Sequence, residues 1–148
     1  ERSVQSVYNS ISDHFSNTRH YLWPSVKEFL ESLPIYSIVG DIGCGNGKNM
    51  DYLCHNKYYF IGMDFSQKFL EICTNKQLEV IAANNFNIPL KTNSLDHCIS
   101  IAVIHHLATE ENRIKCINEL LRITNFNGSI MIQVWAFERE HNKSFESI

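Results

Sequence analysis

A glycine-rich turn follows the first short apolar strand pattern of the chain. It reads D-I-G-C-G-N-G from Asp41 to Gly47 and follows Ile38, Val39 and Gly40. Glycines let the backbone bend tightly and approach a ligand without obstruction from a Cβ atom. The dinucleotide fingerprint G-x-G-x-x-G would need glycine where Lys48 stands, and the phosphate-loop pattern has no match here either. The turn therefore predicts a ligand site at the carboxyl end of a strand. The absence of both phosphate-binding patterns indicates that the turn does not hold this ligand by phosphate groups.

Segments with the spacing of strands alternate with segments that have the spacing of helices. Strands are expected at residues 38–41, 58–64, 79–83, 96–103 and 130–135. Helices are expected at residues 4–18, 24–33 and 48–55 and after residues 66 and 109, whereas residues 84–95 have no helical period. This alternation predicts the α/β class with a doubly wound, mostly parallel sheet. We expect one domain over residues 1–148, with an N-terminal helical arm at 1–35 and the sheet core at 36–148.

Local signals mark several of the expected boundaries. Ser66 and Thr109 are suited to cap the helices that follow them, and Asn127-Gly128 predicts a turn before the last strand. The apolar residues expected on one face of the last helix are Ile114, Ile117, Leu120 and Leu121.

The composition excludes several classes of protein. Of the 148 residues, 44% are hydrophobic and 20% are charged, which is typical of a globular domain and not of a disordered chain. No apolar run approaches the roughly 20 residues that cross a bilayer, and the net charge of -3 does not indicate a strongly basic surface. Five cysteines without a C-x-x-C pair favour free thiols in a reducing compartment, so we expect a cytoplasmic protein without a zinc site.

Two acidic residues close neighbouring strands of the predicted sheet. Asp41 precedes the glycine turn, and Asp64 ends the second strand as G-M-D. A carboxylate at the second position is placed to accept hydrogen bonds from both hydroxyls of a ribose. Two carboxylates beside a turn without phosphate contacts suit a nucleoside that carries positive charge. S-adenosylmethionine, with its adenosine, sulfonium and ammonium groups, has this chemistry.

Longer motifs carry a resemblance to a known family. They are residues 7–19 (V-Y-N-S-I-S-D-H-F-S-N-T-R), 23–24 (W-P), 41–48 (D-I-G-C-G-N-G-K), 100–106 (S-I-A-V-I-H-H) and 133–138 (Q-V-W-A-F-E). With them the chain resembles class I S-adenosylmethionine-dependent methyltransferases, most narrowly the tRNA wobble-uridine carboxymethyl methyltransferases. The resemblance implies a Rossmann-like fold and methyl transfer from S-adenosylmethionine to the carboxylate of 5-carboxymethyluridine in tRNA. Since that class has seven strands and this chain begins at Glu1 without methionine, we expect a chain that is incomplete, in particular at its C-terminal end.

The motifs and the strand ends together indicate which residues contact the cofactor. They are Tyr8, Arg19, Asp41, Gly43, Cys44, Gly45, Gly47, Asp64, Phe65, Asn84, Asn85, Phe86, Ile101, Ala102 and Val103. Asn84 stands where the family has an acidic residue, and its amide oxygen can still accept a hydrogen bond from the adenine amino group.

The catalytic residues implied by the resemblance are Arg19 and His105. Arg19 is expected to pair with a carboxylate, of either the cofactor or the substrate, and His105 to position the substrate. His106 and Trp135 are expected in the substrate site, where Trp135 either stacks on a flipped uridine or packs in the core. A carboxylate is already ionised near pH 7, so methyl transfer to it requires no general base.

Two further side chains of the motifs, Trp23 and Lys48, are not expected to contact the cofactor. No metal site is expected. Trp23 is expected to pack the first helix of the core region against the sheet. Lys48 is expected to contact either tRNA phosphates or solvent.

The resemblance also implies two partners. One is tRNA, and the other is a small zinc-binding activator subunit that forms a heterodimer at the edge of the sheet beside residues 78–82. Two alternatives remain open at this point: a methyltransferase that acts on a small molecule or a protein, and a scaffold subunit that binds the cofactor without catalysis.

Overall fold

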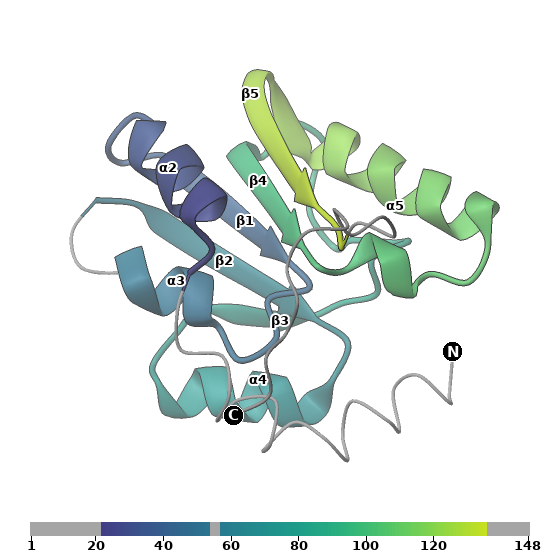
Figure 1. The fold of residues 1–148 in the computed structure, drawn as a ribbon, viewed down its shortest axis with the longest axis horizontal. Helices are drawn as coiled ribbons and strands as arrows, with labels where there is room; N and C mark the ends of the chain where they lie inside the picture. The colour runs from purple at the N-terminus through teal and green to yellow at the C-terminus, as the bar shows by residue number, and fades with distance from the viewer. Residues whose placement is uncertain (1–21, 54–56, 136–148) are drawn as a thin grey trace, which may run out of the picture.

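Five parallel strands form the centre of the computed structural model, which describes residues 22–53 and 57–135 (Figure 1). In spatial order they are β3 (Val80–Ala82), β2 (Tyr59–Asp64), β1 (Ile38–Ile42), β4 (Leu95–Ile101) and β5 (Thr124–Gln133). All four strand pairs of this sheet are parallel, which confirms the expected α/β class. The strand order reverses between β1 and β4, and ligands of such sheets bind at this reversal, beyond the carboxyl ends of the strands. The helix expected at residues 4–18 lies outside the described residues.

Helices cover both faces of the sheet. They are α2 (Pro24–Ser32), α3 (Lys48–Leu53), α4 (Gln67–Asn75), the short 3-10 helix η1 (Ile104–His106) and α5 (Glu110–Ile123). Ile99 of β4 shares a buried cluster with Val26 and Leu30 of α2, whereas its neighbour Cys98 shares one with Leu120 of α5. Successive strand residues point to opposite faces, so α2 and α5 cover opposite sides of the sheet.

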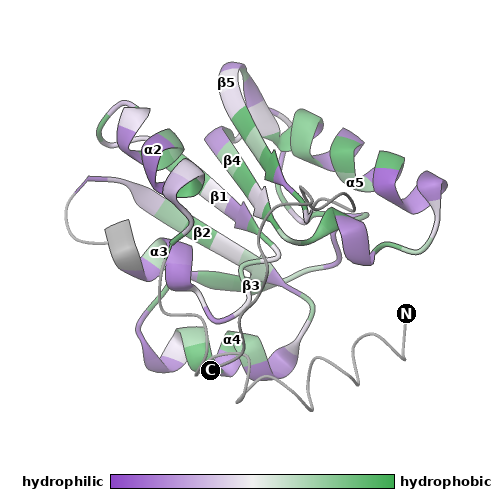
Figure 2. Ribbon diagram, in the orientation of Figure 1, coloured by the Kyte–Doolittle hydropathy of each residue, from purple (hydrophilic) through white to green (hydrophobic). Residues whose placement is uncertain are grey.

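The start of α5 shows how local sequence sets a helix end. Thr109 accepts a hydrogen bond from the Asn112 N–H at 3.2 Å, which confirms the expected cap. Glu110 and Glu111 occupy the first turn, where negative charge interacts favourably with the helix dipole. Figure 2 shows this end of α5 as hydrophilic, whereas hydrophobic and hydrophilic residues alternate along the rest of the helix. No helix within residues 22–53 and 57–135 is both long and apolar enough to cross a membrane.

The expected buried face of α5 is partly wrong. Ile114 is 50% exposed and Leu121 is 61% exposed, whereas Cys116, Leu120 and Ile123 are fully buried. The buried residues recur at intervals of four and three, as one face of a helix requires. The small thiol of Cys116 is part of that face, and the larger Ile114 and Leu121 are not.

The beginnings of α4 and β5 also differ from expectation. The Ser66 side chain makes no capping hydrogen bond; instead, Asp64 Oδ1 accepts from the Ser66 N–H at 2.8 Å. Strand β5 begins at Thr124, so Asn127-Gly128 lies within it and not in a turn before it. Between the pairs Leu95–Thr124 and His97–Ser129 the register shifts, because β4 advances by two residues and β5 by five. The extra residues form an irregular bulge.

Substitution of Gly128, which lies in this bulge, tests how tightly the bulge packs against β4. A Cβ atom there would collide with the backbone carbonyl oxygen of Asp96 and lie 2.6 Å from Thr124 Cγ2. We expect Gly128→Ala to lower the free energy of unfolding by about 1–3 kcal/mol, because a backbone atom yields less easily than a side chain. Urea unfolding followed by circular dichroism measures this. The exposed neighbour gives the control, Asn127→Ala, and equal stability of both variants would contradict the expectation.

Candidate functional site

A cavity of about 290 Å³ lies beyond the carboxyl ends of the strands. Its volume is close to the lower limit of about 300 Å³ for small-molecule sites. Its wall comes from the ends of β2 and β4, from the loops after β1, β2, β3 and β4, from the residue before α2, and from single residues or pairs in α3, α4, η1 and α5. The lining residues are Trp23, Gly43, Cys44, Gly45, Asn46, Lys48, Asn49, Asp64, Phe65, Ser66, Phe69, Asn84, Asn85, Phe86, Ile101, Ala102, Val103, His106, Leu107, Ala108 and Asn112.

The glycine turn is joined to the end of β2 by backbone hydrogen bonds. The N–H groups of Gly43 and Cys44 both donate to the Met63 carbonyl, at 2.7 and 2.9 Å. The Gly45 N–H donates to Asp64 Oδ2 at 2.9 Å. Gly45 has φ of 54°, and a Cβ atom there would meet no other atom within 4 Å, so the turn presents bare backbone to open space. A ligand can therefore approach the main chain at this position.

Gly47 serves packing and does not line the cavity. A Cβ atom at this residue would lie 2.5 Å from Leu78 Cδ1 and 2.9 Å from Cys73 Sγ. The Cys73 thiol donates a hydrogen bond to the Gly45 carbonyl at 3.2 Å. The third glycine of the turn thus lets α4 and the segment before β3 support the loop from behind.

Asp64 connects the turn to the start of α4. One carboxylate oxygen accepts from Gly45 and the other from the Ser66 N–H, at 2.9 and 2.8 Å. Burial raises the pKa of Asp64, although these backbone hydrogen bonds lower it. Each oxygen retains a second lone pair, so this cavity-lining carboxylate can still accept hydroxyl groups of a ligand.

Asp41 lies outside the cavity wall and is fully buried. Asn49 Nδ2 donates to Asp41 Oδ2 at 3.1 Å. Burial, together with the smaller effect of the negative charge of Asp64, raises the pKa of Asp41 to about 7, against the lowering effects of the Asn49 hydrogen bond and of Lys48. Among the described residues, Asp41 Oδ1 and Asn49 Oδ1 are buried without a hydrogen-bond partner. The pair therefore has two acceptor oxygens that a proton or a cationic ligand group would stabilise.

The loop after β3 carries Asn84, Asn85 and Phe86 into the cavity wall. Asn84 Oδ1 accepts from the Phe86 N–H at 2.9 Å, so the amide first organises its own loop. As the sequence predicts, no helix forms between β3 and β4. The loop therefore needs support from another element.

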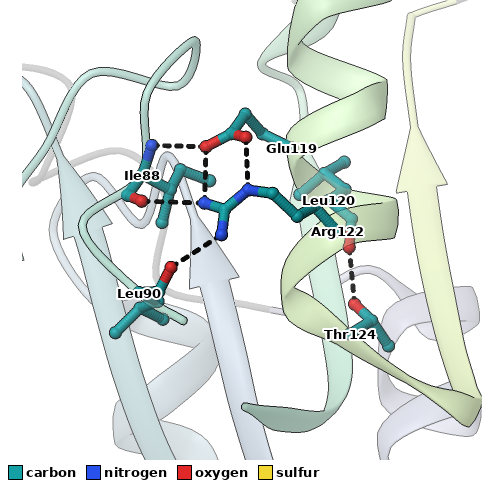
Figure 3. A network of polar contacts seen from close by, with 6 residues as sticks. All are labelled: Ile88, Leu90, Glu119, Leu120, Arg122 and Thr124. Atoms are coloured by element: carbon teal, nitrogen blue, oxygen red, sulfur yellow. Dashed lines mark hydrogen bonds and ion pairs between the residues drawn. The ribbon is translucent and has the colours of Figure 1, made fainter. Parts of the chain in front are cut away.

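Arg122 of α5 provides this support (Figure 3). Its guanidinium donates to the carbonyls of Ile88 and Leu90 at 2.9 and 2.7 Å and to both Glu119 oxygens at 2.6 and 2.8 Å. Glu119 in turn accepts from the Ile88 N–H at 2.6 Å. The hydrogen bond from Arg122 lowers the pKa of Glu119, which stays ionised. The network fastens the chain that follows Asn84–Phe86 to α5.

The chain turns over the cavity directly after β4. Ala102 has φ of 59°, which is uncommon for a residue with a Cβ atom, and its N–H donates to the Gln133 carbonyl at 2.8 Å. Such conformations persist where surrounding structure holds them, often at ligand sites. A Cβ atom on Gly43 would collide with the Val103 side chain, so the loop after β4 packs directly on the glycine turn.

The two histidines that follow are in contact with each other. Nε2 of His105 lies 3.0 Å from Nε2 of His106, and their ring centroids are 4.1 Å apart. His106 lines the cavity, and His105 does not. Within residues 22–53 and 57–135, no group of three or more histidine, cysteine, aspartate or glutamate side chains is arranged to hold a metal ion.

The structure brings most of the predicted cofactor residues together. Those in the wall are Gly43, Cys44, Gly45, Asp64, Phe65, Asn84, Asn85, Phe86, Ile101, Ala102 and Val103. Of the other predicted cofactor residues, Asp41 and Gly47 lie outside the wall, and Tyr8 and Arg19 lie outside the described residues. Of the residues predicted for the substrate site, His106 lies in the wall, whereas His105 and Trp135 lie outside it. Sequence reasoning missed Trp23 and Lys48 as wall residues. Both residues belong to the motifs at 23–24 and 41–48, but membership of a motif does not separate a wall residue from a packing or surface residue.

The raised pKa of Asp41 makes stability depend on pH. Without ligand, the folded protein keeps a proton on Asp41 that the unfolded chain, with its ordinary pKa of 3.8, releases. We therefore expect the free energy of unfolding to fall as pH rises from about 4 to 7, by up to about 1.4 kcal/mol per pH unit from this group.

Asp41→Asn should remove this part of the slope, because the amide does not titrate. Its NH2 group also supplies a donor to the pair with Asn49. Urea unfolding at pH 5, 6 and 7 measures the difference, with the half-exposed Asp51→Asn as control. Equal slopes for wild type and Asp41→Asn would contradict the expectation.

Comparisons with known proteins agree with this geometry. The tRNA (carboxymethyluridine(34)-5-O)-methyltransferase of Mus musculus is 48% identical over 142 residues, which cover 95% of this chain and 21% of the relative. The protein of the same name from Arabidopsis thaliana is 47% identical over 141 residues, which cover 95% of this chain and 34% of the relative. The chain thus spans about a fifth to a third of the length of these relatives.

Solved structures and family patterns point the same way. A chain from the solved complex of the Haloferax volcanii Trm112 methyltransferase activator with a methyltransferase superposes with a TM-score of 0.70. It is 20% identical, and the match covers 84% of this chain and 58% of that one, so it supports the fold. The sequence pattern of the methyltransferase domain family matches residues 40–132, from β1 to the end of β5. This match contains the glycine turn and the strand ends that build the cavity, and the chain therefore belongs to the methyltransferase domain family.

Proposed function

We propose that this chain is the S-adenosylmethionine-dependent catalytic domain of a tRNA methyltransferase. The reaction we assign is methyl transfer to the carboxylate of 5-carboxymethyluridine at the wobble position, which forms the methyl ester. The observation that carries the assignment of the ligand is the open backbone at Gly45 beside the Asp64 carboxylate, in a cavity at the switch point of the sheet. The choice of acceptor rests on the relatives that are 47–48% identical and are named for this reaction.

The residues of the cavity fit this cofactor. Asp64 would accept hydrogen bonds from the ribose hydroxyls, and the loop at Asn84–Phe86 would border the adenine. The methionine part would lie along the glycine turn and Ala102. The Asp64 carboxylate in the wall suits a nucleoside that carries positive charge. S-adenosylmethionine, when bound, supplies a methyl group on a positively charged sulfur.

This chain's own residues then align the acceptor and exclude water. The acceptor carboxylate is already ionised near pH 7 and attacks as the anion. The reaction therefore requires no general base. Bringing the carboxylate into line and removing water from it are the main tasks of the protein. We assign the positioning of the acceptor to His106, from the cavity wall, and to His105 beside it. Arg19, as the second carboxylate contact, remains a prediction for a residue outside the described part of the chain.

Replacement of Asp64 tests the function. In the full-length protein, we expect Asp64→Asn to weaken binding of S-adenosylhomocysteine by about tenfold to a hundredfold, because hydrogen bonds to a charged group are worth about 1.5–3 kcal/mol. Titration calorimetry measures binding. Methyl transfer to an anticodon stem-loop with 5-carboxymethyluridine at position 34 measures activity.

The exposed carboxylate of α5 gives the control variant, Glu111→Gln, which should bind and react as wild type does. Cofactor binding by wild type without methylation of this stem-loop would refute the acceptor. Absence of cofactor binding would favour a domain without catalysis.

We further propose a heterodimer with a small zinc-binding activator subunit at the edge of β3. In the described sheet β3 is an edge strand, and Val80 and Ile81 on it are only partly buried. An open edge of this kind invites pairing with a strand of another chain. The Haloferax volcanii structure is a complex with a methyltransferase activator, which supports a partner of this kind.

Because four of the cysteines are free and buried, we place the protein in the cytoplasm.

Lysine on the open edge tests the heterodimer. Ala82 is exposed, and a lysine on an edge strand discourages strand addition. We expect the full-length protein and an activator subunit to elute as a 1:1 complex in size-exclusion chromatography with light scattering, and Ala82→Lys to weaken it. Ser129→Lys, at an exposed position of β5 on the opposite edge, is the matched control. Equal losses in both variants would contradict the assignment to β3.

A further inference from the structure

Four aromatic rings form a continuous row at the β5 side of the cavity. The centroids of Trp23 and Trp135 are 6.5 Å apart with an interplanar angle of 56°. Trp135 contacts His105 edge-on at 6.3 Å, and His105 contacts His106 at 4.1 Å. These distances lie within the range in which aromatic pairs attract each other. The row connects the residue before α2 with the residues after β4 and β5.

Only the two ends of this row belong to the cavity wall. Trp23 and His106 line the cavity, whereas Trp135 and His105 lie outside its wall. Trp135 therefore touches the ring of Trp23 from outside the cavity. Trp135 is exposed on the outside, so a planar ligand inside the cavity can reach the ring of Trp23 and not that of Trp135.

The strand order places this row on the acceptor side. Asp64 ends β2, Asn84–Phe86 follow β3, the glycine turn follows β1, and the histidines follow β4. The sheet order β3-β2-β1-β4-β5 thus separates the nucleoside contacts proposed for the cofactor from Trp135, which follows β5. A hydrogen bond of 3.1 Å from Ser25 Oγ to Gln133 Oε1 joins the first turn of α2 to the last residue of β5. Trp23 is held on this side of the site.

Lys48 adds a positive charge to the same wall. It lines the cavity, and its Nζ lies over the Trp23 ring, 5.5 Å from the centroid. A cation at this position attracts a carboxylate while the indole offers a flat apolar surface. A flat surface and an adjacent ammonium group suit a planar heteroaromatic acid.

We infer that Trp23 is the stacking surface for the acceptor base and that Lys48 attracts its carboxylate. Trp135 is then a positioning residue, which acts by holding the ring of Trp23. The inference rests on the proposed function, because it names how the 5-carboxymethyluridine base is held. It adds a role to the packing expected of Trp23, which is confirmed, because Trp23 packs against the core cluster that α2 shares with the sheet.

Variants of Trp23 separate acceptor binding from cofactor binding. In the full-length protein, Trp23→Leu should raise KM for the 5-carboxymethyluridine stem-loop roughly tenfold to a hundredfold, because base stacking on an aromatic ring is worth that much. The Kd of S-adenosylhomocysteine should stay unchanged, and Trp23→Phe should restore most of the acceptor binding. Trp135→Leu should raise this KM by a smaller factor. In the double variant it should add little to the effect of Trp23→Leu, since the two residues act together. Lys48→Gln should weaken binding of this stem-loop and not of one with unmodified uridine.

A second readout keeps the inference independent of turnover. The nucleoside 5-carboxymethyluridine, added with S-adenosylhomocysteine present, should quench tryptophan fluorescence in wild type and quench less in Trp23→Leu. Circular dichroism melting checks that each variant is folded. If wild type does not methylate the stem-loop, the proposed function is wrong. The fluorescence quenching then still shows whether the base stacks on Trp23. A parallel loss of S-adenosylhomocysteine binding in Trp23→Leu, or an unchanged KM, would overturn the inference.

Discussion

The hydrogen bonds between the glycine turn and the end of β2 hold the site together. Met63 accepts from two successive N–H groups of the turn, and Asp64 accepts from a third. Because these bonds occupy the main chain of the turn from one side, its other side at Gly45 remains bare. The same contacts orient the Asp64 carboxylate toward the cavity. A single local arrangement thus provides both the open backbone and the acidic group.

Burial of negative charge is the electrostatic consequence of this arrangement. Asp41 lies inside the sheet and Asp64 at its end, and burial raises the pKa of both. Two desolvated carboxylates that repel each other are stabilised by protonation or by a cation. A positively charged nucleoside therefore gains affinity from a feature that, without ligand, lowers the stability of the folded protein near neutral pH.

Most elements of the fold could be predicted, and the errors have local physical causes. Strands and helices follow from hydrophobic spacing, which is written in consecutive residues. The face of α5 was misjudged because the small side chain of Cys116 takes a core position while the larger Ile114 and Leu121 are exposed. The start of β5 was misjudged because Asn127-Gly128, usually a turn signal, forms a bulge inside the strand. Most residues of the cavity wall could be predicted as well, since the carboxyl ends of parallel strands lie at the same edge of the sheet.

The sequence by itself determined the α/β class, the turn at Asp41–Gly47 and the acidic end of β2, because each depends on residues that are neighbours in the chain. Only the tertiary structure decided that Trp23 lines the cavity, that Trp135 lies outside its wall and that Arg122 supports the loop after β3. These placements depend on how α2, β5 and α5 pack on the sheet. The spacing of residues along one segment contains no information about which distant segment its side chains will meet.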